Sequence, residues 1–391
     1  MSSSVLTASD RRLSLAAILA SAFGVGLTFG MATPLVSLML EGRGHGSMAI
    51  GMVAAGFSLA VLASGPFVPG VLRRIGAVHA LVWGSLATAV ALAATPFAGA
   101  LAAIFLLRFL MGLGGGLAWI ASETWINSLP SDRSRGRVVA AYTTIWGAGL
   151  AGGPVILNLT GTAGAKPFLM AACILAAAVL PVLAARRLAP PMGGKGEAGG
   201  RLTAVLAAAP AALAAGFLGG FCEGAVFALF PVYGLASGYD AGGAVLLMSA
   251  FAAGGIVLQV PVGWLADRME RRTLAAAIAA VSVGCVVAMP WALLHTATAW
   301  PVLFLWGGAA AAFYTIGLIL LGTRFGGGDL ASANTAFILT YTVGLIAGPT
   351  VGGAAMAAWP PHGLLATIGV VYAAYLAAML FRPGRRTAGA E

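Results

Sequence analysis

Three charged side chains stand inside long apolar stretches of this sequence: Arg108, Glu123 and Glu223. A charge in such surroundings is costly, so it is expected to face a polar interior and to take part in binding or moving another charge. A glutamate that alternates between a dry site and a wet cavity can carry a proton, which makes Glu223 the first candidate for a proton or substrate carboxylate and Glu123 the second. Arg108 is a candidate for proton relay or substrate contact; the alternative is that it anchors neighbouring carbonyl groups.

Arg108 and Glu123 belong to one predicted helix. Their separation of fifteen residues corresponds to about 22 Å of helical rise and about 60° of rotation. Both side chains can therefore line one face at different depths, with Arg108 nearer the outside, but they cannot pair with each other. For Glu123 the alternative to a transport role is a structural ion pair with Arg135 or Arg137.

The scaffold that positions these side chains is apolar almost throughout. Of the 391 residues, 60% are hydrophobic and 8% are charged, and the mean hydropathy is +0.98. A soluble domain carries about 25% charged residues, so this chain has too few polar side chains to cover a water-facing surface. The apolar runs are continuous and far longer than the alternating strands of about ten residues in an outer-membrane barrel. Composition therefore predicts an all-α membrane protein.

A helix that crosses a membrane needs roughly 20 apolar residues, and the chain offers twelve such runs. We expect transmembrane helices at 13–39, 48–70, 78–99, 101–128, 138–161, 166–189, 205–236, 242–265, 273–295, 299–322, 332–358 and 363–382. With the N-terminus in the cytoplasm, 18 of the 21 Lys and Arg residues fall in cytoplasmic segments, whereas Arg43 and Lys166 fall in outside loops and Arg108 lies within a span. This bias predicts a multi-pass protein of a bacterial cytoplasmic (inner) membrane with both termini in the cytoplasm.

Other kinds of chemistry find little support in the residue spacing. Cys173, Cys222 and Cys285 lie singly in apolar runs, with neither metal-binding nor disulfide spacing. The Gly-x-x-x-x-Gly-Lys-Ser/Thr pattern of an ATP site does not occur in the sequence. A metal-handling loop around His45 and Met48 is the weaker alternative to ordinary packing. We expect no cofactor, no metal, no nucleic-acid partner and no enzymatic activity.

The two halves of the chain share motifs at nearly constant separations. Gly149-x-x-x-Gly153-Pro154 recurs 195 residues later as Gly344-x-x-x-Gly348-Pro349, Gly65 with Arg73-Arg74 recurs 198 residues later, and Pro34 recurs as Pro231. A stretch rich in Gly and Pro, 190–203, separates six predicted helices in 1–189 from six in 204–391. We expect two pseudo-symmetric six-helix bundles joined by a cytoplasmic linker. Parallel six-helix repeats with a site between them near mid-membrane are a transporter architecture.

Several segments resemble signatures of the major facilitator superfamily (MFS). The segment Gly263-Trp264-Leu265-Ala266-Asp267-Arg268-Met269-Glu270-Arg271-Arg272 is similar to the superfamily's loop motif, and the first-half copy has Pro69 in place of the acid. Arg108-x-x-x-Gly112-x-Gly114 resembles the fourth-span signature. The run from Gly344 to Gly353 resembles the antiporter glycine motif but lies in the eleventh span, and the fifth-span copy is shorter.

Within the superfamily, the chain is most similar to the bacterial YcaD-like subgroup. The similarity rests on Glu123, on Ser134-Arg135-Gly136-Arg137 and on Ala141-Tyr142. The resemblance implies the MFS fold of twelve transmembrane helices, secondary transport by alternating access, and a monomer.

The loop motif predicts a conformational latch. Its residues are Gly263, Asp267, Arg268, Arg271 and Arg272, with Arg73 and Arg74 as the incomplete copy in the first half. An aspartate can accept hydrogen bonds at the start of a neighbouring helix, the arginines can bind acids or helix-end carbonyl groups, and the glycine lets backbones approach closely. Such contacts hold one arrangement of the bundle and break in the other. The alternative is ordinary positive charge on cytoplasmic loops.

Polar and aromatic residues inside the predicted spans are candidates for lining a central cavity that binds substrate. They are Trp119, Trp125, Asn127, Tyr142, Trp146, Asn158, Phe227, Gln259, Tyr314, Asn334 and Tyr341. Trp146 and Tyr341 occupy matching repeat positions, which favours a paired role. Aromatic, amide and acidic side chains together suit a moderately apolar, planar or cationic organic solute.

The sequence thus predicts a secondary active transporter that moves a small organic solute by alternating access, coupled to protons. The glycine motif favours efflux by antiport, and uptake by symport is the close alternative. A receptor or scaffold on the same fold, which moves no solute, is the second class, and a lipid flippase is the third. Intramembrane acids favour transport, because a scaffold has no need of them.

Overall fold

The computed structural model describes residues 8–129, 135–189, 205, 208–325 and 327–381, and in these segments it is helical with no strand. The first half consists of α1 (Ala8–Gly42), α2 (Ser47–Ser64), α3 (Val68–Ala94), η1 (Thr95–Phe97), α4 (Leu101–Ser128), α5 (Arg135–Thr160), α6 (Lys166–Ala177), α7 (Leu180–Ala184) and η2 (Arg186–Leu188). The second half consists of α9 (Pro210–Ala236), α10 (Ala241–Val257), α11 (Gln259–Ala266), α12 (Arg271–Ala292), α13 (Thr296–Gly322), α14 (Gly327–Ala358) and α15 (Gly363–Phe381). The expected linker 190–203 lies outside the described residues.

The predicted all-α architecture with twelve transmembrane helices is confirmed. The described residues form 12 helical segments that are long and apolar enough to cross a membrane. Helices are the expected form of such segments, because every backbone N–H and C=O group in lipid must find its partner within the segment. The connection before α10 is short: α9 ends at Ala236 and α10 begins directly after Asp240, whose carboxylate accepts a hydrogen bond of 3.1 Å from the N–H of Gly243.

Two of the spans are broken by proline, the sixth in the first half and the eighth in the second half. The sixth span divides between α6 and α7, where α6 ends at Ala177, four residues before Pro181. The eighth span divides between α10 and α11, where α10 ends at Val257, four residues before Pro261. Proline has no N–H to offer the carbonyl four residues earlier, so each helix stops at that carbonyl.

The predicted boundary between the second and third spans is corrected by the structure. The second span was expected to run to residue 70, but α2 ends at Ser64, before Gly65-Pro66, and α3 already begins at Val68. Pro66 has no N–H to offer the carbonyl of Leu62, four residues earlier, which explains the early end. Gly76, with a φ of 78°, kinks α3, so Arg73 and Arg74 lie in its short first segment and not in a loop.

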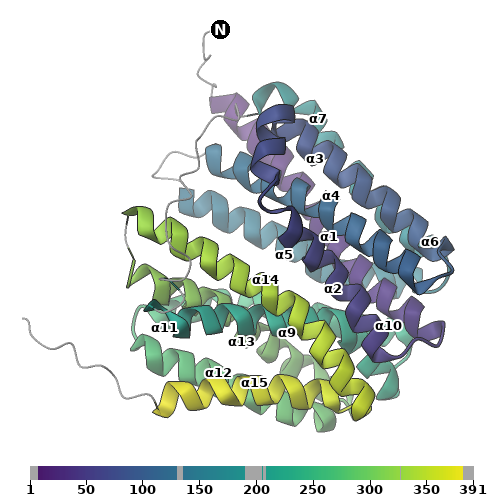
Figure 1. Ribbon diagram of the computed structural model, residues 1–391, viewed down its shortest axis with the longest axis vertical. Helices are drawn as coiled ribbons and strands as arrows, with labels where there is room; N and C mark the ends of the chain where they lie inside the picture. The colour runs from purple at the N-terminus through teal and green to yellow at the C-terminus, as the bar shows by residue number, and fades with distance from the viewer. Residues whose placement is uncertain (1–7, 130–134, 190–204, 206–207, 326, 382–391) are drawn as a thin grey trace, which may run out of the picture.

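The helices pack into two groups that follow the halves of the chain. In the first half, α1 packs on α5 and α6, and α3 packs on α4; in the second half, α9 packs on α14, α10 on α13, and α12 on α13 and α15. Figure 1 shows the two groups as a purple-to-blue bundle above a green-to-yellow one. The division agrees with the six-plus-six arrangement expected from the repeats.

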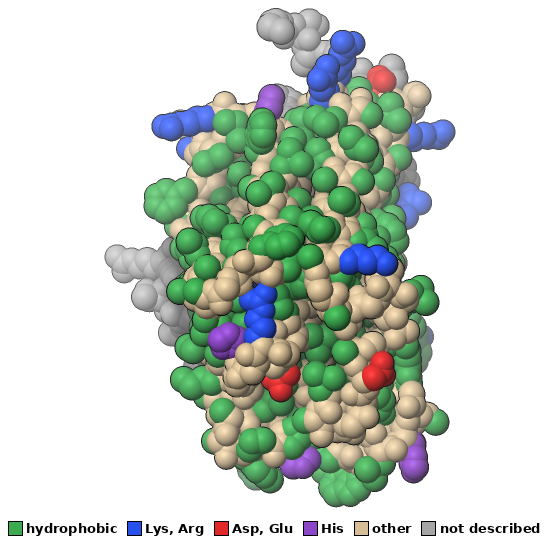
Figure 2. Space-filling view, turned by 90° about the vertical axis from the view of Figure 1, so that its right-hand side faces the viewer, with side chains coloured by type: hydrophobic (Ala, Val, Ile, Leu, Met, Phe, Trp, Pro, Cys, Tyr) green, Lys and Arg blue, Asp and Glu red, His purple; other side chains and the backbone are tan. Residues whose placement is uncertain are grey.

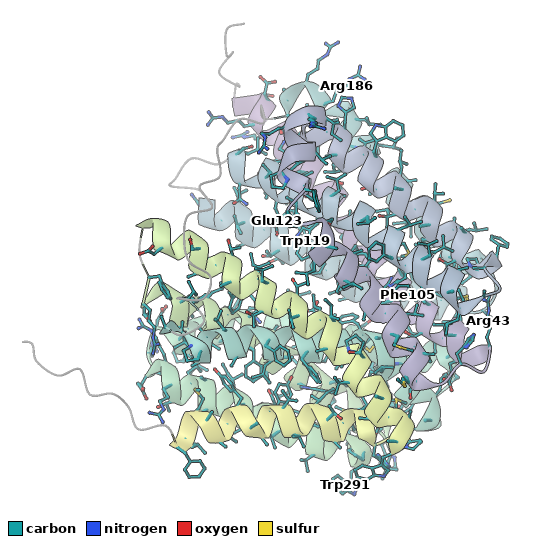
Figure 3. All side chains as sticks on the ribbon, in the orientation of Figure 1. Arg43, Phe105, Trp119, Glu123, Arg186 and Trp291 are labelled. Carbon is teal, nitrogen blue, oxygen red and sulfur yellow. The ribbon has the colours of Figure 1, made fainter. Side chains whose placement is uncertain are left out.

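The two ends of the bundle differ in charge. We call one the arginine-rich end; among the described residues it holds Arg73, Arg74, Arg137, Arg186, Arg187, Arg268, Arg271, Arg272 and Arg324. We call the other the opposite end; it holds Arg43 and Lys166. Arg186 and Arg43 mark the two ends in Figure 3. Figure 2 looks toward the opposite end, where hydrophobic side chains cover much of the face and few charged ones are seen.

The two halves touch each other toward the opposite end. The contacting pairs are α2 with α14, α5 with α10, and α1 and α2 with α9. Ser47 on α2 donates a hydrogen bond of 2.9 Å to the carbonyl of Gly353 on α14, and Ser249 on α10 donates one of 2.8 Å to the carbonyl of Ala151 on α5. In Figure 1 the bundles converge at this end and diverge toward the arginine-rich end.

Residues on the diverging part of the halves are exposed although they belong to membrane spans. Trp119 and Tyr314 are 42% and 37% exposed, and Glu123, Thr124 and Asn127 are exposed as well. Polar side chains in a span are costly against lipid and are found facing the bundle interior or a water-filled space. Their exposure together with the divergence of the bundles indicates a molecule that is open toward the arginine-rich end and closed at the opposite end.

Candidate functional site

Glu223 lies in the middle of α9 and faces α14. Its carboxylate accepts a hydrogen bond from the hydroxyl of Tyr341 on α14. The side chain is half-buried. A carboxylate in an apolar span is stabilised by a hydroxyl donor, so this contact fixes its orientation at the junction of the two helices.

A close crossing of α9 and α14 makes that hydrogen bond reachable. Gly344 and Gly348 on α14 face the backbone carbonyls of Phe217 and Phe221 on α9, and a Cβ at either glycine would collide with them. The glycine run that the sequence analysis singled out therefore serves close helix packing, as small residues do between membrane helices. The crossing places Tyr341 beside Glu223.

An aromatic row continues from Tyr341 across the second half. The rings of Tyr341 and Tyr314 on α13 meet edge to face with centroids 5.3 Å apart, and Tyr314 meets Phe337 on α14 in the same way at 5.2 Å. Edge-to-face geometry is favoured by the ring quadrupoles. Tyr314 is the exposed member of the row.

Glu123 lies on α4 of the first half, toward the arginine-rich end. The indole N–H of Trp119, one helical turn earlier, donates a hydrogen bond of 2.8 Å to its carboxylate, and the Asn127 side chain donates one of 2.8 Å to its backbone carbonyl. Figure 3 shows Trp119 and Glu123 at the boundary between the two bundles. Arg137 is exposed and makes no contact with Glu123 within the described part of the chain, and the Arg135 side chain lies outside it.

Glu123 and Glu223 come from different halves of the chain. Glu223 is linked to Tyr314 through Tyr341, which bonds the carboxylate and meets the ring of Tyr314. Beside Glu123, Ser122 shares a hydrogen bond of 3.0 Å with the hydroxyl of Tyr142 on α5. Glu123 thus lies at the boundary between the bundles and Glu223 at the junction of α9 and α14.

Arg108, the third predicted ionisable residue, occupies a separate place. It is buried in the first half, donates a hydrogen bond of 2.6 Å to the hydroxyl of Thr33 on α1, and lies over the ring of Phe57 on α2 at 5.2 Å from its centroid. Its Nε has no partner among the described residues. Phe29 connects this group to Trp146 of α5, because it packs against both Phe57 and Trp146.

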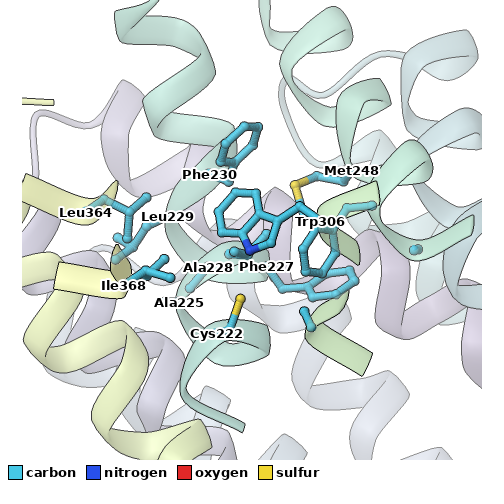
Figure 4. Close-up of a cluster of buried hydrophobic side chains, with 14 of the residues drawn as sticks. Cys222, Ala225, Phe227, Ala228, Leu229, Phe230, Met248, Trp306, Leu364 and Ile368 are labelled. Carbon is cyan, nitrogen blue, oxygen red and sulfur yellow. The ribbon is translucent and has the colours of Figure 1, made fainter. Parts of the chain in front are cut away.

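The remaining cavity candidates divide between the site and the helix packing. Gln259, at the start of α11, accepts a hydrogen bond of 2.6 Å from Thr315, the residue after Tyr314. Asn334 is half-buried on α14. Phe227, expected to line the cavity, is instead buried against Phe251 in the cluster around Cys222 and Trp306 that Figure 4 shows.

Two further candidates and Tyr142 are also placed differently from the expectation. Trp125 is fully buried, and its indole N–H donates a hydrogen bond of 3.0 Å to Ser14 on α1. Tyr142 is buried in the same cluster of the first half. Asn158 lies near the opposite end, where its side chain adjoins Gly242 of α10. The reason is that helices of this chain are apolar on every side, so residue type alone does not identify the inner face.

The residues that the sequence analysis missed are short hydroxyl side chains. Thr33, which holds Arg108, Ser47 and Ser249, which join the halves, and Thr315, which holds Gln259, were not singled out. The available signal is weak, because Ser and Thr are common in membrane spans and satisfy themselves by bonding the preceding helical turn. Thr33 directly precedes Pro34, which marks the repeat.

Comparison with known protein families decides the classification. The family model described as the Major Facilitator Superfamily matches residues 18–308 and 240–391. This chain belongs to the major facilitator superfamily. It is therefore a multi-pass membrane transporter and, like its relatives, is not classified among enzymes.

Similar MFS proteins are found in several bacteria. YfkF of Bacillus subtilis, an uncharacterized MFS-type transporter, is 28% identical over 337 residues, which cover 84% of this chain and 85% of YfkF. The MFS-type transporter YcaD of Escherichia fergusonii is 28% identical over 283 residues, 72% of either chain. The YcaD resemblance noted in the sequence is thus confirmed.

Solved structures share the MFS fold with this chain. The crystal structure of the nucleoside transporter NupG superimposes with a TM-score of 0.70 at 18% identity, covering 94% of this chain and 97% of NupG. A mutant of NupG superimposes with a TM-score of 0.75 at 15% identity, covering 94% and 98%. At these identities the similarity concerns the fold.

The MFS loop motif holds two arginines in local contacts. Arg268 stacks on the ring of Trp264 at 3.9 Å from its centroid, and Arg272 donates hydrogen bonds of 2.6 and 3.4 Å to the carbonyls of Met379 and Leu380 at the end of α15. Asp267 is exposed and makes no hydrogen bond or ion pair with any residue that the structure describes.

The other residues of the predicted latch lie open in this structure. Arg271, Arg73 and Arg74 are exposed, and a Cβ at Gly263 would meet no atom within 4 Å. The bundles diverge at the arginine-rich end, and Asp267 has no hydrogen bond or ion pair with the other half among the described residues.

Proposed function

We propose that this protein is a secondary active transporter that exports a small organic solute across the bacterial inner membrane in exchange for protons. The observation that carries the proposal is that each half holds a carboxylate inside a span, Glu123 at the boundary between the bundles and Glu223 in the middle of α9, each held by an aromatic donor. In transporters built from two repeats, the sites for substrate and coupling ion lie at the interface between the repeats. Carboxylates at that interface can therefore bind both the solute and the proton. The carrier acts as a monomer and needs no cofactor.

The membrane orientation follows from the charge of the two ends. Arginine and lysine collect on cytoplasmic loops of membrane proteins, so the arginine-rich end is assigned to the cytoplasm together with both termini. The state described above is then open to the cytoplasm and closed to the outside. The chain divides into a first bundle, 1–189, a cytoplasmic linker, 190–203, and a second bundle, 204–391.

Alternating access requires the halves to rock about the site. The contacts of Ser47 with Gly353 and of Ser249 with Ala151 have to break before the site opens outward. Residues of the loop motif, Asp267 and the arginines beside it, then find partners in the other half as the cytoplasmic end closes. A solute moves only if it changes the relative stability of these two states.

Proton coupling is assigned to the two glutamates. Among the described residues, the carboxylate of Glu223 accepts from the hydroxyl of Tyr341, and that of Glu123 accepts from the indole of Trp119. A carboxylate of this kind can release its proton when its surroundings become wet and regain it when they become dry. Arg108 contributes by holding α1, α2 and α4 together, which fixes the wall of the first half.

Direction is the less constrained part of the proposal. The glycine run of α14 supports antiport, and uptake by proton symport is the alternative that the incomplete copy in α5 leaves open. A receptor on the same fold that moves no solute is the remaining alternative. Intramembrane carboxylates speak for transport, because a receptor gains nothing from a charge in a span.

Transport is tested with purified protein in two steps. A thermal-shift screen against solute libraries at several pH values identifies ligands, because a ligand stabilises the state it binds. Each ligand is then followed in proteoliposomes under an imposed pH gradient. Movement of the solute against its own gradient, abolished by a protonophore, supports the proposal, and its direction relative to the proton flux separates antiport from symport.

The variants Glu223→Gln and Glu123→Gln test the coupling itself. Each is expected to lose gradient-driven accumulation while solute exchange at equal pH continues. Unchanged gradient-driven transport in either variant removes that residue from the coupling mechanism. A protein that binds ligand but moves none under any gradient is a receptor, and the transport proposal then fails.

A further inference from the structure

An apolar groove, which we call the α4 groove, runs along the first half between α2, α3 and α4. Its first part, where α2 ends and α3 begins, has a volume of about 350 Å³, and its second part, between α3 and α4, has one of about 500 Å³. Leu113 of α4 lines both parts, so they are continuous. The apolar side chains that line the first part are Ala63, Phe67, Val68, Val71, Leu113 and Leu117.

The α4 groove opens on the outer surface of the bundle and not on the site between the halves. Leu117 precedes Glu123 by six residues, which places the two side chains about 120° apart around α4. Leu106 and Leu110 continue the face of Leu117 and are exposed. Since α4 packs on α2 and α3 and all three helices are membrane spans, the exposed apolar face between them meets lipid.

The length of the α4 groove corresponds to one leaflet of a bilayer. From Leu117 in the first part to Leu107 in the second there are ten residues, or about 15 Å of helical rise, and the hydrocarbon core of a bilayer is about 30 Å thick. Phe67 is 72% exposed and lies in the connection between α2 and α3. The groove therefore begins at the membrane surface on the arginine-rich side and ends near the middle of the bilayer, which is the reach of one acyl chain.

Arginine without an acidic partner lies at the surface end of the α4 groove. Arg74 follows the groove residue Val71 by three positions in the short first segment of α3, so the two side chains are neighbours on one helical face. Arg74 is exposed and makes no hydrogen bond or ion pair with the residues that the structure describes. Between Glu41 and Glu123 the sequence contains no Asp or Glu. The three helices around the groove thus offer positive charge that no acid of their own groove-lining segments neutralises.

The first-half copy of the loop motif departs from the second-half copy at this place. Pro69 stands where the acid should be, whereas the second half has Asp267. Gly76, with its φ of 78°, separates the segment that carries Arg73 and Arg74 from the rest of α3. An arginine pair that has lost its acid and lies at the membrane surface has an anionic lipid headgroup as its available partner.

We propose that the α4 groove binds one anionic phospholipid, with its phosphate on Arg74 and one acyl chain along α4 between α2 and α3. A guanidinium can donate two parallel hydrogen bonds to a phosphate, and a basic side chain near a membrane surface contributes about 1 kcal/mol to the binding of anionic lipid. The apolar walls accept the chain of any phospholipid, so the preference for an anionic headgroup comes from the arginine. The inference uses neither intramembrane glutamate and does not depend on which solute is moved.

Quenching of tryptophan fluorescence by brominated lipid reports a chain in the α4 groove. Trp83 lines the second part, is 62% exposed, and lies seven residues beyond Gly76, or about 10 Å deeper. The full-length protein is reconstituted in dioleoylphosphatidylcholine vesicles that contain a small fraction of phosphatidylglycerol or of phosphatidylcholine, in either case brominated at the middle of the chains. The signal of Trp83 is the difference between this protein and its Trp83→Phe variant. Phosphatidylglycerol is expected to quench half of that signal at about a fivefold lower fraction, the ratio to which 1 kcal/mol corresponds.

Three variants separate a bound lipid from general attraction to a basic surface. Arg74→Gln is expected to remove most of the preference for phosphatidylglycerol. Arg187→Gln is the matched control, because Arg187 is exposed at the same end but lies in η2, which lines no part of the groove. It is expected to keep the preference. Leu113→Phe keeps the arginine but narrows the groove where its two parts meet, so it is expected to reduce the quenching of Trp83 by both lipids.

Equal quenching of Trp83 by the two lipids overturns the inference, and so does an equal loss of preference in Arg74→Gln and Arg187→Gln. Unchanged quenching in Leu113→Phe means that the chain lies elsewhere and contradicts the proposed groove. If neither lipid quenches Trp83, the groove is covered by protein, for example by a second copy of the chain, and the inference fails. The measurement needs neither solute nor gradient, so its outcome is separate from that of the transport test.

Discussion

The hydroxyl of Ser47 on α2 lies 2.9 Å from the carbonyl oxygen of Gly353 on α14 and donates a hydrogen bond to it. This bond joins the two halves at the opposite end, where α2 and α14 are packed together. Since the halves diverge at the other end, the bond belongs to one of the two states that alternating access requires. Removal of this bond is therefore expected to shift the equilibrium between those states.

Replacing Ser47 with alanine is expected to favour opening at the opposite end. The bond contributes about 0.5–1.5 kcal/mol, so its loss raises the population of the opened state about two- to thirteenfold. A cysteine in place of Ile50, which is 1% exposed beside Ser47, reports the opening through its rate of alkylation by an impermeant maleimide. Cys173, which is exposed, is first replaced by serine.

Ser64→Ala is the matched control for that experiment. Its hydroxyl bonds the carbonyl of Val61 in its own helix, at 3.1 Å, and joins nothing between the halves. It is expected to leave the alkylation rate unchanged. An equal rate in the Ser47→Ala and unmodified proteins would mean that the contact does not control access at this end.

Tyr341→Phe is expected to slow transport without unfolding the protein. The ring keeps its edge-to-face contact with Tyr314, but Glu223 loses its hydroxyl donor. A loss of about tenfold in the rate of gradient-driven transport corresponds to about 1.4 kcal/mol, close to the lower end of the range for a hydrogen bond to a charged group.

The matched control for this variant is Tyr375→Phe. Its hydroxyl donates to the backbone carbonyl of Ala211 at 3.3 Å, away from Glu223. We expect it to change stability slightly and transport hardly at all. If both variants slow transport equally, the effect comes from helix packing, and the bond to Glu223 has no special role.

The pair of Thr33 and Arg108 predicts a cost in stability. Thr33→Ala removes the hydroxyl that accepts from Arg108 at 2.6 Å and leaves a second buried N–H of the guanidinium unpaired. The expected destabilisation is about 1–3 kcal/mol, seen as a lower melting temperature. Thr160→Ala is the control, because its hydroxyl only bonds Ile156 in the preceding turn, and it is expected to stay within about 0.5 kcal/mol. A melting temperature that falls no further in Thr33→Ala than in the control would contradict a structural role for this bond.

Much of the architecture was predictable because a membrane restricts what a chain can do. A span needs about 20 apolar residues, and basic residues collect in the loops on the cytoplasmic side. The number of transmembrane helices and their orientation can therefore be predicted from the apolar runs and the positions of Lys and Arg. Glu123 and Glu223 were found for the same reason, since a charge stands out against an apolar background. Broken spans were less visible, although Pro181 and Pro261 end their helices four residues upstream.

The inner face of each helix was not predictable in the same way. Soluble helices reveal their buried side by the polar residues on the other, but in a membrane both lipid and protein neighbours are apolar. Hence Trp125 and Phe227, which are buried between helices, look in the sequence like Trp119 and Tyr314, which are exposed between the halves. Contacts such as that of Thr33 with Arg108 depend on packing between distant segments, which residue types do not specify.

The loop after α11 gives a prediction that separates a latch from simple surface charge. Asp267 makes no hydrogen bond or ion pair with the described residues, whereas Arg272 binds the carbonyl of Met379 at 2.6 Å. Asp267→Asn is therefore expected to leave the melting temperature within the range of about 0.5 kcal/mol but to slow transport, because its partner is met only when the arginine-rich end closes. Arg272→Ala is expected to destabilise this state by about 1.5–3 kcal/mol.

Arg271→Ala, at an exposed neighbouring position, shows how much of the Arg272→Ala destabilisation comes from loss of loop charge alone. Positive charge on a cytoplasmic loop sets orientation during insertion and has no reason to depend on an acid beside it. Full transport activity of Asp267→Asn would therefore mean that the loop motif acts only through its positive charge and not as a latch. Slow transport with unchanged stability is expected only if Asp267 acts in a state other than the one described, which is what a latch does.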